Sequence, residues 1–203
     1  MTIDHVIIFG VGAAGSNVFL NLVATYPDLS YTCVDSDVVE PRNYQAGTQP
    51  YTKADVGRPK VQAIQRIIQQ QFGKRIEAVN KRILVSGNLY DIIHGPGYDE
   101  TAVLIDAFDN ARSRNLFIDL CKGCSVLHVG FSGQLTGEAV WDAVFTPMKE
   151  HASDAAIDVC QLPRARSFIM GLTANAALVA SEFIETGKKR NVYYDTRPVL
   201  RTY

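Results

Sequence analysis

Apolar runs that end in glycine or an acid alternate with helix-like segments from the start of the chain. Residues 6–10, VIIFG, form an unbroken apolar run closed by glycine, which is typical of a parallel strand covered on both faces. Residues 11–26 have helical periodicity, and residues 29–35, LSYTCVD, are a second strand-like run. Together these segments predict one βαβ unit and the beginning of a parallel sheet.

The same alternation continues after a long polar loop. Residues 55–73 predict a helix with Lys60 in its first turn and an apolar stripe on one face. Further elements are expected as strands at 76–83, 102–108 and 125–133, helices at 110–123 and 167–185, and an antiparallel edge strand at 137–145. Prolines and scattered acids predict a flexible loop at 146–166, and residues 188–203 predict a short strand or tail.

These elements predict an α/β fold. We expect a Rossmann-like, mostly parallel sheet with helices on both faces and antiparallel strands added at one edge. With 203 residues, 47% of them apolar, the chain has an ample core for one domain over residues 1–203.

Charge and targeting signals narrow the function classes. The formal net charge of -1 gives no overall field that would attract DNA or an anionic membrane. The N-terminal apolar run is too short for a signal peptide, so a cytoplasmic protein is expected. The apolar segment 167–185 contains Thr173, Asn175 and Glu182, which favours a buried helix over a membrane span.

A glycine motif follows the first predicted strand. Gly10, Gly12 and Gly15 fit G-x-G-x-x-G at a strand-to-helix turn, where backbone N–H groups attract phosphate. Asp35 ends the next strand, 20 residues after Gly15, in the place of an acid that binds ribose hydroxyls. The alternative is a turn that needs glycine only for its backbone conformation. It is disfavoured because the strand, the turn, the helix and the acid all occur in the order expected of a nucleotide-binding motif.

Further polar residues follow Asp35. Asp37, Asn43, Gln49 and Lys60 suit a triphosphate better than hydride transfer. At a helix N-terminus, Lys60 is expected to offer both its ammonium group and backbone donors to phosphate oxygens.

A second acidic segment, IDAFDNARSRN at residues 105–115, begins where a strand is expected to end. Asp109 would then lie at the carboxyl edge of the sheet, where open α/β folds bind ligands, and could hold Mg²⁺ that bridges phosphates. The alternative role for Asp109 is an N-cap of the next helix.

Four motifs, GVGAAGSN, DSDVVEPRN, DVGRPK and DAFDNARSRN, occur in order. They resemble the adenylating superfamily that includes ThiF, MoeB and the ubiquitin-activating enzymes. The resemblance implies an ATP site in which Asp35 holds the ribose, Asn43 and Lys60 contact phosphate, and Asp109, followed by Asn110, positions Mg²⁺.

The same resemblance implies a reaction and its partners. A carboxylate, usually the C-terminal glycine of a small ubiquitin-like or sulfur-carrier protein, would attack the α-phosphate and release pyrophosphate, leaving an acyl adenylate. A carboxylate on tRNA or a peptide is the alternative substrate within the family. Members are usually dimers, so a homodimer is expected.

The chain departs from the family at one phosphate contact. Where the family usually has N-x-x-R-Q, this chain has Ala46 in place of the arginine. Arg42 or Arg58 could replace the guanidinium, and Gln49 could replace the glutamine. The departure leaves open an inactive nucleotide-binding partner subunit, while the glycine loop and Asp35 alone would also suit an NAD-dependent oxidoreductase.

The cysteines suggest little metal chemistry. Cys121 and Cys124 form one C-x-x-C without a second pair, so a zinc site is not expected, and Mg²⁺ would arrive with ATP. Cys160 is the candidate for a thioester nucleophile, since Arg164 and Arg166 lie close in sequence and would favour thiolate. The alternative is that this lone loop cysteine is incidental.

Overall fold

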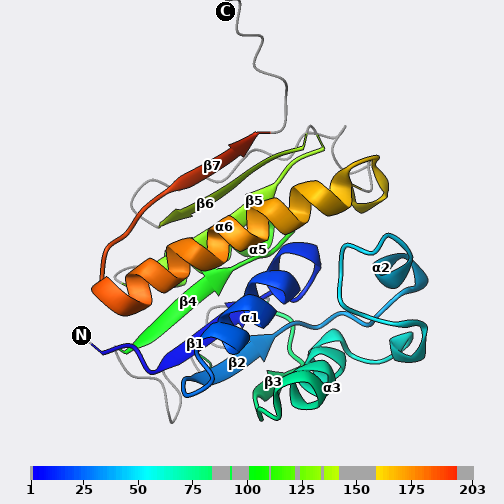
Figure 1. The fold of residues 1–203 in the computed structure, drawn as a ribbon, viewed down its shortest axis with the longest axis horizontal. Helices are drawn as coiled ribbons and strands as arrows, with labels where there is room; N and C mark the ends of the chain where they lie inside the picture. The colour runs from blue at the N-terminus through cyan, green and yellow to red at the C-terminus, as the bar shows by residue number, and fades with distance from the viewer. Residues whose placement is uncertain are drawn as a thin grey trace, which may run out of the picture.

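A mixed sheet forms the centre of the protein (Figure 1). The computed structural model describes residues 2–83, 92, 101–109, 111–121, 124–133, 135–141 and 159–195. Within these residues the sheet has seven strands in the order β3-β2-β1-β4-β5-β6-β7. Their bounds are β1 His5–Phe9, β2 Ser30–Val34, β3 Glu77–Val79, β4 Ala102–Asp106, β5 Val126–Phe131, β6 Thr136–Trp141 and β7 Val192–Asp195.

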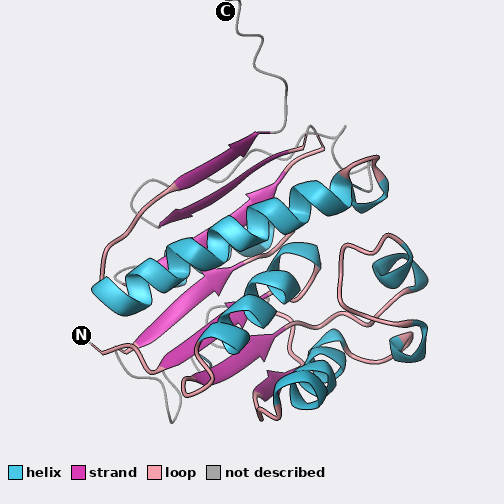
Figure 2. Ribbon diagram, in the orientation of Figure 1, coloured by secondary structure: helices cyan, strands magenta, loops and turns pink. Residues whose placement is uncertain are grey.

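The first five strands in this order are parallel, and β6 and β7 are added antiparallel at one edge. The α/β fold predicted from the sequence is therefore confirmed. Figure 2 shows the helices against this sheet. They are α1 Ala13–Thr25, α2 Pro41–Gln45, α3 Lys60–Phe72, α5 Ala111–Leu120 and α6 Ala165–Thr186, with short 3₁₀ helices at Lys53–Asp55 and Val159–Gln161.

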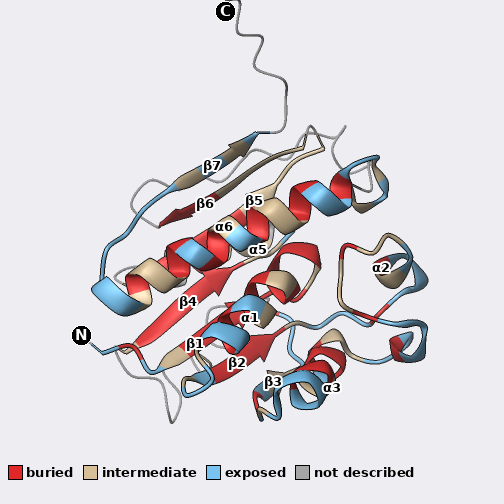
Figure 3. Cartoon of the chain, viewed as in Figure 1, coloured by how far each residue is buried: buried red, intermediate tan, exposed pale blue. Residues whose placement is uncertain are grey.

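Helices lie on both faces of the sheet. On one face α1 packs against α6 on one side and α3 on the other, and α5 covers the opposite face (Figure 1). Alternation along β1 explains the two cores, because Val6 and Ile8 pack with one helix layer while Ile7 and Phe9 pack with the other. Figure 3 shows the buried central strands between these layers.

The long apolar helix α6 is a core element, as predicted. By length and composition it could cross a membrane, but half of its most apolar stretch is buried inside the protein, against α1 and β6. Ala176 and Ala180 are fully buried and belong to the core cluster that also contains residues of α1.

Some boundaries differ from those predicted. The strand expected at 76–83 is only three residues long, Glu77–Val79, because it pairs with β2 alone at the edge of the sheet. The loop expected at 146–166 ends in helical turns, and α6 begins at Ala165. The expected tail supplies β7, and its last residues, like 142–158, lie outside the described residues.

Candidate functional site

The strand order reverses between β1 and β4, and open α/β folds bind ligands at the carboxyl edge of the sheet at such a point. Phe9 and Asp106 are register partners at the ends of these two parallel strands. The Ala107 amide also donates to the Phe9 carbonyl at 2.8 Å. The glycine loop and the segment that leads to Asp109 therefore leave the sheet side by side, at the position where open α/β folds bind ligands.

The glycine loop has two different steric requirements. Gly10 has a φ of +86° and a Cβ built on it would lie 2.8 Å from the Ala107 carbonyl oxygen, while a Cβ on Gly15 would lie 1.8 Å from the Gly10 carbonyl oxygen. Only glycine fits these two positions. A Cβ on Gly12 would meet nothing within 4 Å, so Gly12 leaves space for a ligand at the start of α1.

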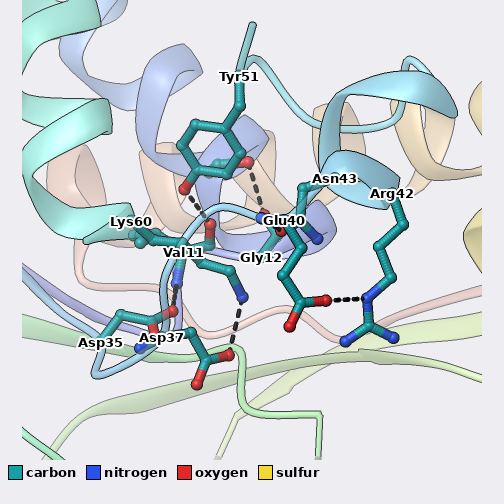
Figure 4. Close-up of polar contacts among 10 residues, drawn as sticks. Val11, Gly12, Asp35, Asp37, Glu40, Arg42, Asn43, Tyr51 and Lys60 are labelled. Carbon is teal, nitrogen blue, oxygen red and sulfur yellow. Dashed lines mark hydrogen bonds and ion pairs between the residues drawn. The ribbon is translucent and has the colours of Figure 1, made fainter. Parts of the chain in front are cut away.

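Asp35 connects β2 to the glycine loop. Its carboxylate accepts hydrogen bonds from the Val11 and Asp37 amides, both at 2.8 Å (Figure 4). Burial raises the pKa of the Asp35 carboxyl, while the charge of Lys60 and the two amides oppose this effect. The structure thus fixes the orientation of the acid that the sequence assigned to the ribose; its contact with a nucleotide stays a prediction.

A polar cavity of about 340 Å³ opens beside this loop. It is lined by Ser36, Asp37, Val38, Glu40, Arg42, Asn43 and Lys60. Residues separated by more than twenty positions in the sequence are therefore brought together, as the polar pattern predicted. A cavity of this volume is within the range of small-molecule sites.

Two ion pairs line the cavity. Lys60 Nζ lies 2.8 Å from Asp37 Oδ2, and Arg42 Nε lies 2.6 Å from Glu40 Oε2 (Figure 4). The Lys60 side chain is only 12% exposed, whereas that of Asp37 is 61% exposed. The lysine is therefore held in place by its surroundings, while its acidic partner faces solvent.

One part of the Lys60 prediction was wrong. The backbone N–H of Lys60 donates to the Asp37 carbonyl at 2.8 Å, so it is not available to a phosphate. This bond forms because Asp37 and Lys60 flank the antiparallel bridge between Val38 and Pro59. Only the ammonium group of Lys60 faces the cavity as a donor.

Asn43 is buried in the cavity wall. Its Oδ1 accepts from the Glu40 amide at 2.7 Å and so completes a capping box on α2. Among the described residues, none accepts a hydrogen bond from the Asn43 amide nitrogen. A ligand oxygen in the cavity would suit this donor.

Gln49 does not line the cavity. Its Oε1 is buried and accepts no hydrogen bond from the described residues, and the same holds for the hydroxyl of Thr48. The segment around them is fixed to α1 and to the glycine loop, since Asn17 Nδ2 donates to the Thr48 carbonyl at 2.8 Å and Tyr51 Oη to the Val11 carbonyl at 2.5 Å. The phosphate role of Gln49 stays a prediction.

Asp109 is exposed at the carboxyl edge, three residues beyond β4. Asn110 lies outside the described residues. Within the described part of the chain, no group of three or more His, Cys, Asp or Glu side chains could hold a metal ion. Such a cage is not required for Mg²⁺, which is often kept by one or two carboxylates plus substrate phosphates, so Asp109 fits this task.

Sequence reasoning missed a buried charge cluster next to Asp109. His128 Nδ1 lies 2.7 Å from Asp106 Oδ2, and the Arg114 guanidinium lies 3.9 Å from the same oxygen. Arg114 also donates to the carbonyls of Phe108 and Val129, both at 2.7 Å. Asp106 and His128 are register partners on adjacent strands, so strand alternation could have suggested the pair.

Sequence reasoning also did not identify a second buried acid, Asp55, whose hydrogen bonds stabilise the structure. It is 1% exposed and accepts from the Thr52 amide and hydroxyl and from the Arg66 guanidinium. Burial acts to raise the pKa of the Asp55 carboxyl, but these hydrogen bonds and the Arg66 charge outweigh it, and the pKa lies below its usual value. Asp55 thereby anchors the loop before α3 to that helix.

The cysteines lie away from the cavity lining. Cys121 packs in the core beside α5, with Cys124 against it, and both are thiols that form no disulfide. Cys160 is partly buried against an apolar cluster that contains Phe168, Ile169 and Leu172. A thioester at Cys160 stays a prediction.

Solved structures share this fold. A crystal structure of E. coli MccB with ATP has a TM-score of 0.63 and 16% identity, covering 92% of this chain and 57% of that chain. The crystal structure of PaaA has a TM-score of 0.68 and 16% identity, covering 96% of this chain and 61% of that chain. The crystal structure of the E. coli tRNA N6-threonylcarbamoyladenosine dehydratase TcdA has a TM-score of 0.54 and 23% identity, covering 64% of this chain and 54% of that chain. The chain thus spans less than two thirds of these relatives, and at such identities the likeness establishes the fold alone. No curated protein sequence matches the chain.

The strand order and the glycine loop define an α/β protein of the Rossmann-like class. The sequence profile of the ThiF family matches residues 2–163, and the chain therefore belongs to the ThiF family. This match confirms the resemblance to the superfamily of ThiF, MoeB and the ubiquitin-activating enzymes.

Proposed function

We propose that the chain is an ATP-dependent adenylyltransferase. It would activate the C-terminal carboxylate of a small ubiquitin-like or sulfur-carrier protein, or of a peptide. A carboxylate oxygen attacks the α-phosphorus of ATP, the bond to the leaving oxygen breaks, and pyrophosphate departs, leaving an acyl adenylate.

The observation that carries this proposal is the cavity beside the glycine loop. Lys60, Arg42 and Asn43 present two cations and an amide donor there, next to an open position at Gly12. Cationic and amide donors suit a polyphosphate, and the hydride-transfer step itself would use neither. Asp35, oriented by the Val11 amide, would accept hydrogen bonds from the ribose hydroxyls.

The chain's own residues would act mainly by position and charge. An attacking carboxylate and a polyphosphate repel each other, and Lys60 and Arg42 would lower that repulsion at the cavity wall. Mg²⁺ would be held by Asp109 with phosphate oxygens of ATP and would supply further charge neutralisation. Pyrophosphate then leaves with its new charge already stabilised by these groups.

A separate carboxylate donor is supported by one of the similar structures, in which E. coli MccB is present together with MccA. We propose that a separate polypeptide likewise supplies the carboxylate here, and that the chain is cytoplasmic and works as a homodimer. The exposed Leu178 on α6, 69% exposed, is a residue that such a dimer interface would bury. Analytical ultracentrifugation of the wild type and of Leu178→Glu would test the dimer.

ATP–pyrophosphate exchange in the presence of candidate small partner proteins tests the activity. Asp109→Ala is expected to reduce exchange by on the order of 10²-fold or more, because the phosphate charge loses its metal-positioning group. Asp28→Ala, which removes another exposed carboxylate just before β2, is the matched control and should exchange normally. ATP binding by the wild type without exchange for any partner would contradict the enzyme and support the second candidate, an inactive partner subunit, which Ala46 favours.

A further inference from the structure

The cationic side chains of the cavity are already balanced by acids. Asp37 pairs with Lys60 and Glu40 pairs with Arg42, at 2.8 and 2.6 Å, so the charged lining residues sum to zero. A triphosphate brings several negative charges to this wall. Removing water from the phosphate charges costs free energy, and two cations that are already paired with acids offset little of it. A further cation near the phosphates would offset this cost.

Arg166 lies against Gly47, two residues after the helix α2 that supplies Arg42 and Asn43 to this wall. It is the second residue of α6, it is exposed, and among the described residues no carboxylate forms an ion pair with it. A Cβ built on Gly47 would lie 3.7 Å from Arg166 Cδ and 3.8 Å from both Nε and Nη1. The guanidinium therefore lies against the backbone just after Ala46, although the two segments are far apart in sequence.

Other contacts fix the start of α6 beside the glycine loop. Ala13, the first residue of α1, packs in one apolar cluster with Phe168 and Ile169 of α6. The segment under Arg166 is held to α1 by the hydrogen bond from Asn17 Nδ2 to the Thr48 carbonyl, and it is continuous with α2, beside which α6 begins in Figure 1. The base of the Arg166 side chain thus has a fixed position near the N-terminus of α1.

Small residues leave room for this side chain. Gly47 has a φ of +64°, a conformation that other residues adopt only with strain, and Ala46 before it carries only a methyl group. Arg58 contributes backbone hydrogen bonds to Asp55 and Val39 and does not line the cavity.

We propose that Arg166 is the residue that binds the polyphosphate of ATP in place of an arginine at position 46. Its guanidinium would reach the phosphates across Gly47 from the first turn of α6 and form charge-assisted hydrogen bonds with their oxygens. This assignment rests on the proposed function, since it takes ATP as the ligand.

Calorimetric titration of ATP and AMP into the 203-residue chain tests the assignment. Arg166→Ala should weaken ATP binding by roughly tenfold to 150-fold, as expected for the loss of a charge-assisted hydrogen bond, and should leave AMP binding almost unchanged. Arg166→Lys should recover part of the loss. Arg75→Ala, which removes an exposed guanidinium just before β3 at the opposite edge of the sheet, is the matched control and should bind both ligands normally.

A second-site variant separates phosphate binding from a structural role. In the Arg166→Ala background, Ala46→Arg should restore the preference for ATP over AMP, which a merely structural arginine would not explain. If Arg166→Ala keeps the wild-type preference for ATP over AMP, this inference is overturned and the proposed function is not. The same holds if Arg58→Ala loses the preference and Arg166→Ala does not. If the wild type does not bind ATP, the proposed function is overturned as well. If ATP binding depends on Arg166 but no pyrophosphate exchange occurs, the inference is supported and only the enzymatic activity is contradicted.

Discussion

The two sides of the strand-order reversal both place a carboxylate next to a basic side chain, in opposite environments. On the β2–α3 side, Asp37 is 61% exposed and pairs with Lys60 at 2.8 Å. On the β4–β5 side, Asp106 is 0% exposed and pairs with His128, 1% exposed, at 2.7 Å. The distances are alike, but solvent reaches only the first pair.

Solvent exposure decides what each pair can do. An exposed ion pair contributes about 0 to 1 kcal/mol, so a phosphate group can replace one partner at little cost. A buried pair is expensive to break, because the remaining charge stays in a medium of low dielectric constant. The first side is therefore suited to exchanging partners with a ligand, and the second to holding the segment before Asp109 in a fixed position.

The largest effect on the free energy of unfolding is expected from removing the buried carboxylate of Asp106. Asp106→Ala would leave Arg114 and His128 without their carboxylate and would also remove the acceptor of the Phe108 amide. We expect the free energy of unfolding to fall by about 3 to 5 kcal/mol, measured by urea denaturation. A loss below about 1 kcal/mol would mean that the two pairs do not differ in the way proposed.

An intermediate effect is expected at Asp55, a buried acid on the side otherwise dominated by exposed pairs. Asp55→Asn should lower the free energy of unfolding by about 1.5 to 3 kcal/mol at neutral pH, because Arg66 loses its charged acceptor. Since the pKa of Asp55 is lowered in the folded protein, its contribution is fully present above the unfolded-state value of about 3.9 and is lost as the pH falls through the folded-state value.

Urea denaturation of wild type and Asp55→Asn across this acidic range checks the prediction. The difference between the two proteins should shrink as the pH decreases below about 4. Asp28→Asn, an exposed acid, is the control and should show no such difference. A difference that is independent of pH would indicate that the hydrogen-bond geometry of Asp55, rather than its charge, stabilises the loop.

The smallest effect on stability is expected at the exposed pair. Asp37→Asn should change the free energy of unfolding by less than about 1 kcal/mol. ATP affinity measured without Mg²⁺ should increase several-fold, because Lys60 is no longer neutralised and a negative charge beside the phosphates is gone. If ATP affinity decreases, Asp37 itself contacts the nucleotide, as the sequence pattern suggested.

Local patterns predicted the parts of the site that depend on neighbouring residues. The glycine loop, Asp35 at the end of β2 and Lys60 at the start of α3 follow from strand and helix signals within short stretches, and the structure has each at the expected place. The sequence could not show that the Lys60 N–H is taken by the Asp37 carbonyl, because that bond depends on how the intervening loop folds back.

The sequence by itself determined the fold class, the family and the residue types of the nucleotide side, because alternation and glycine requirements are local properties of the backbone. Only the tertiary structure decided which distant side chains meet. Asp106 finds His128 through strand register, and Arg166 lies against Gly47 because α6 packs on α1. Such contacts are set by the packing of whole elements, which no short stretch of sequence encodes.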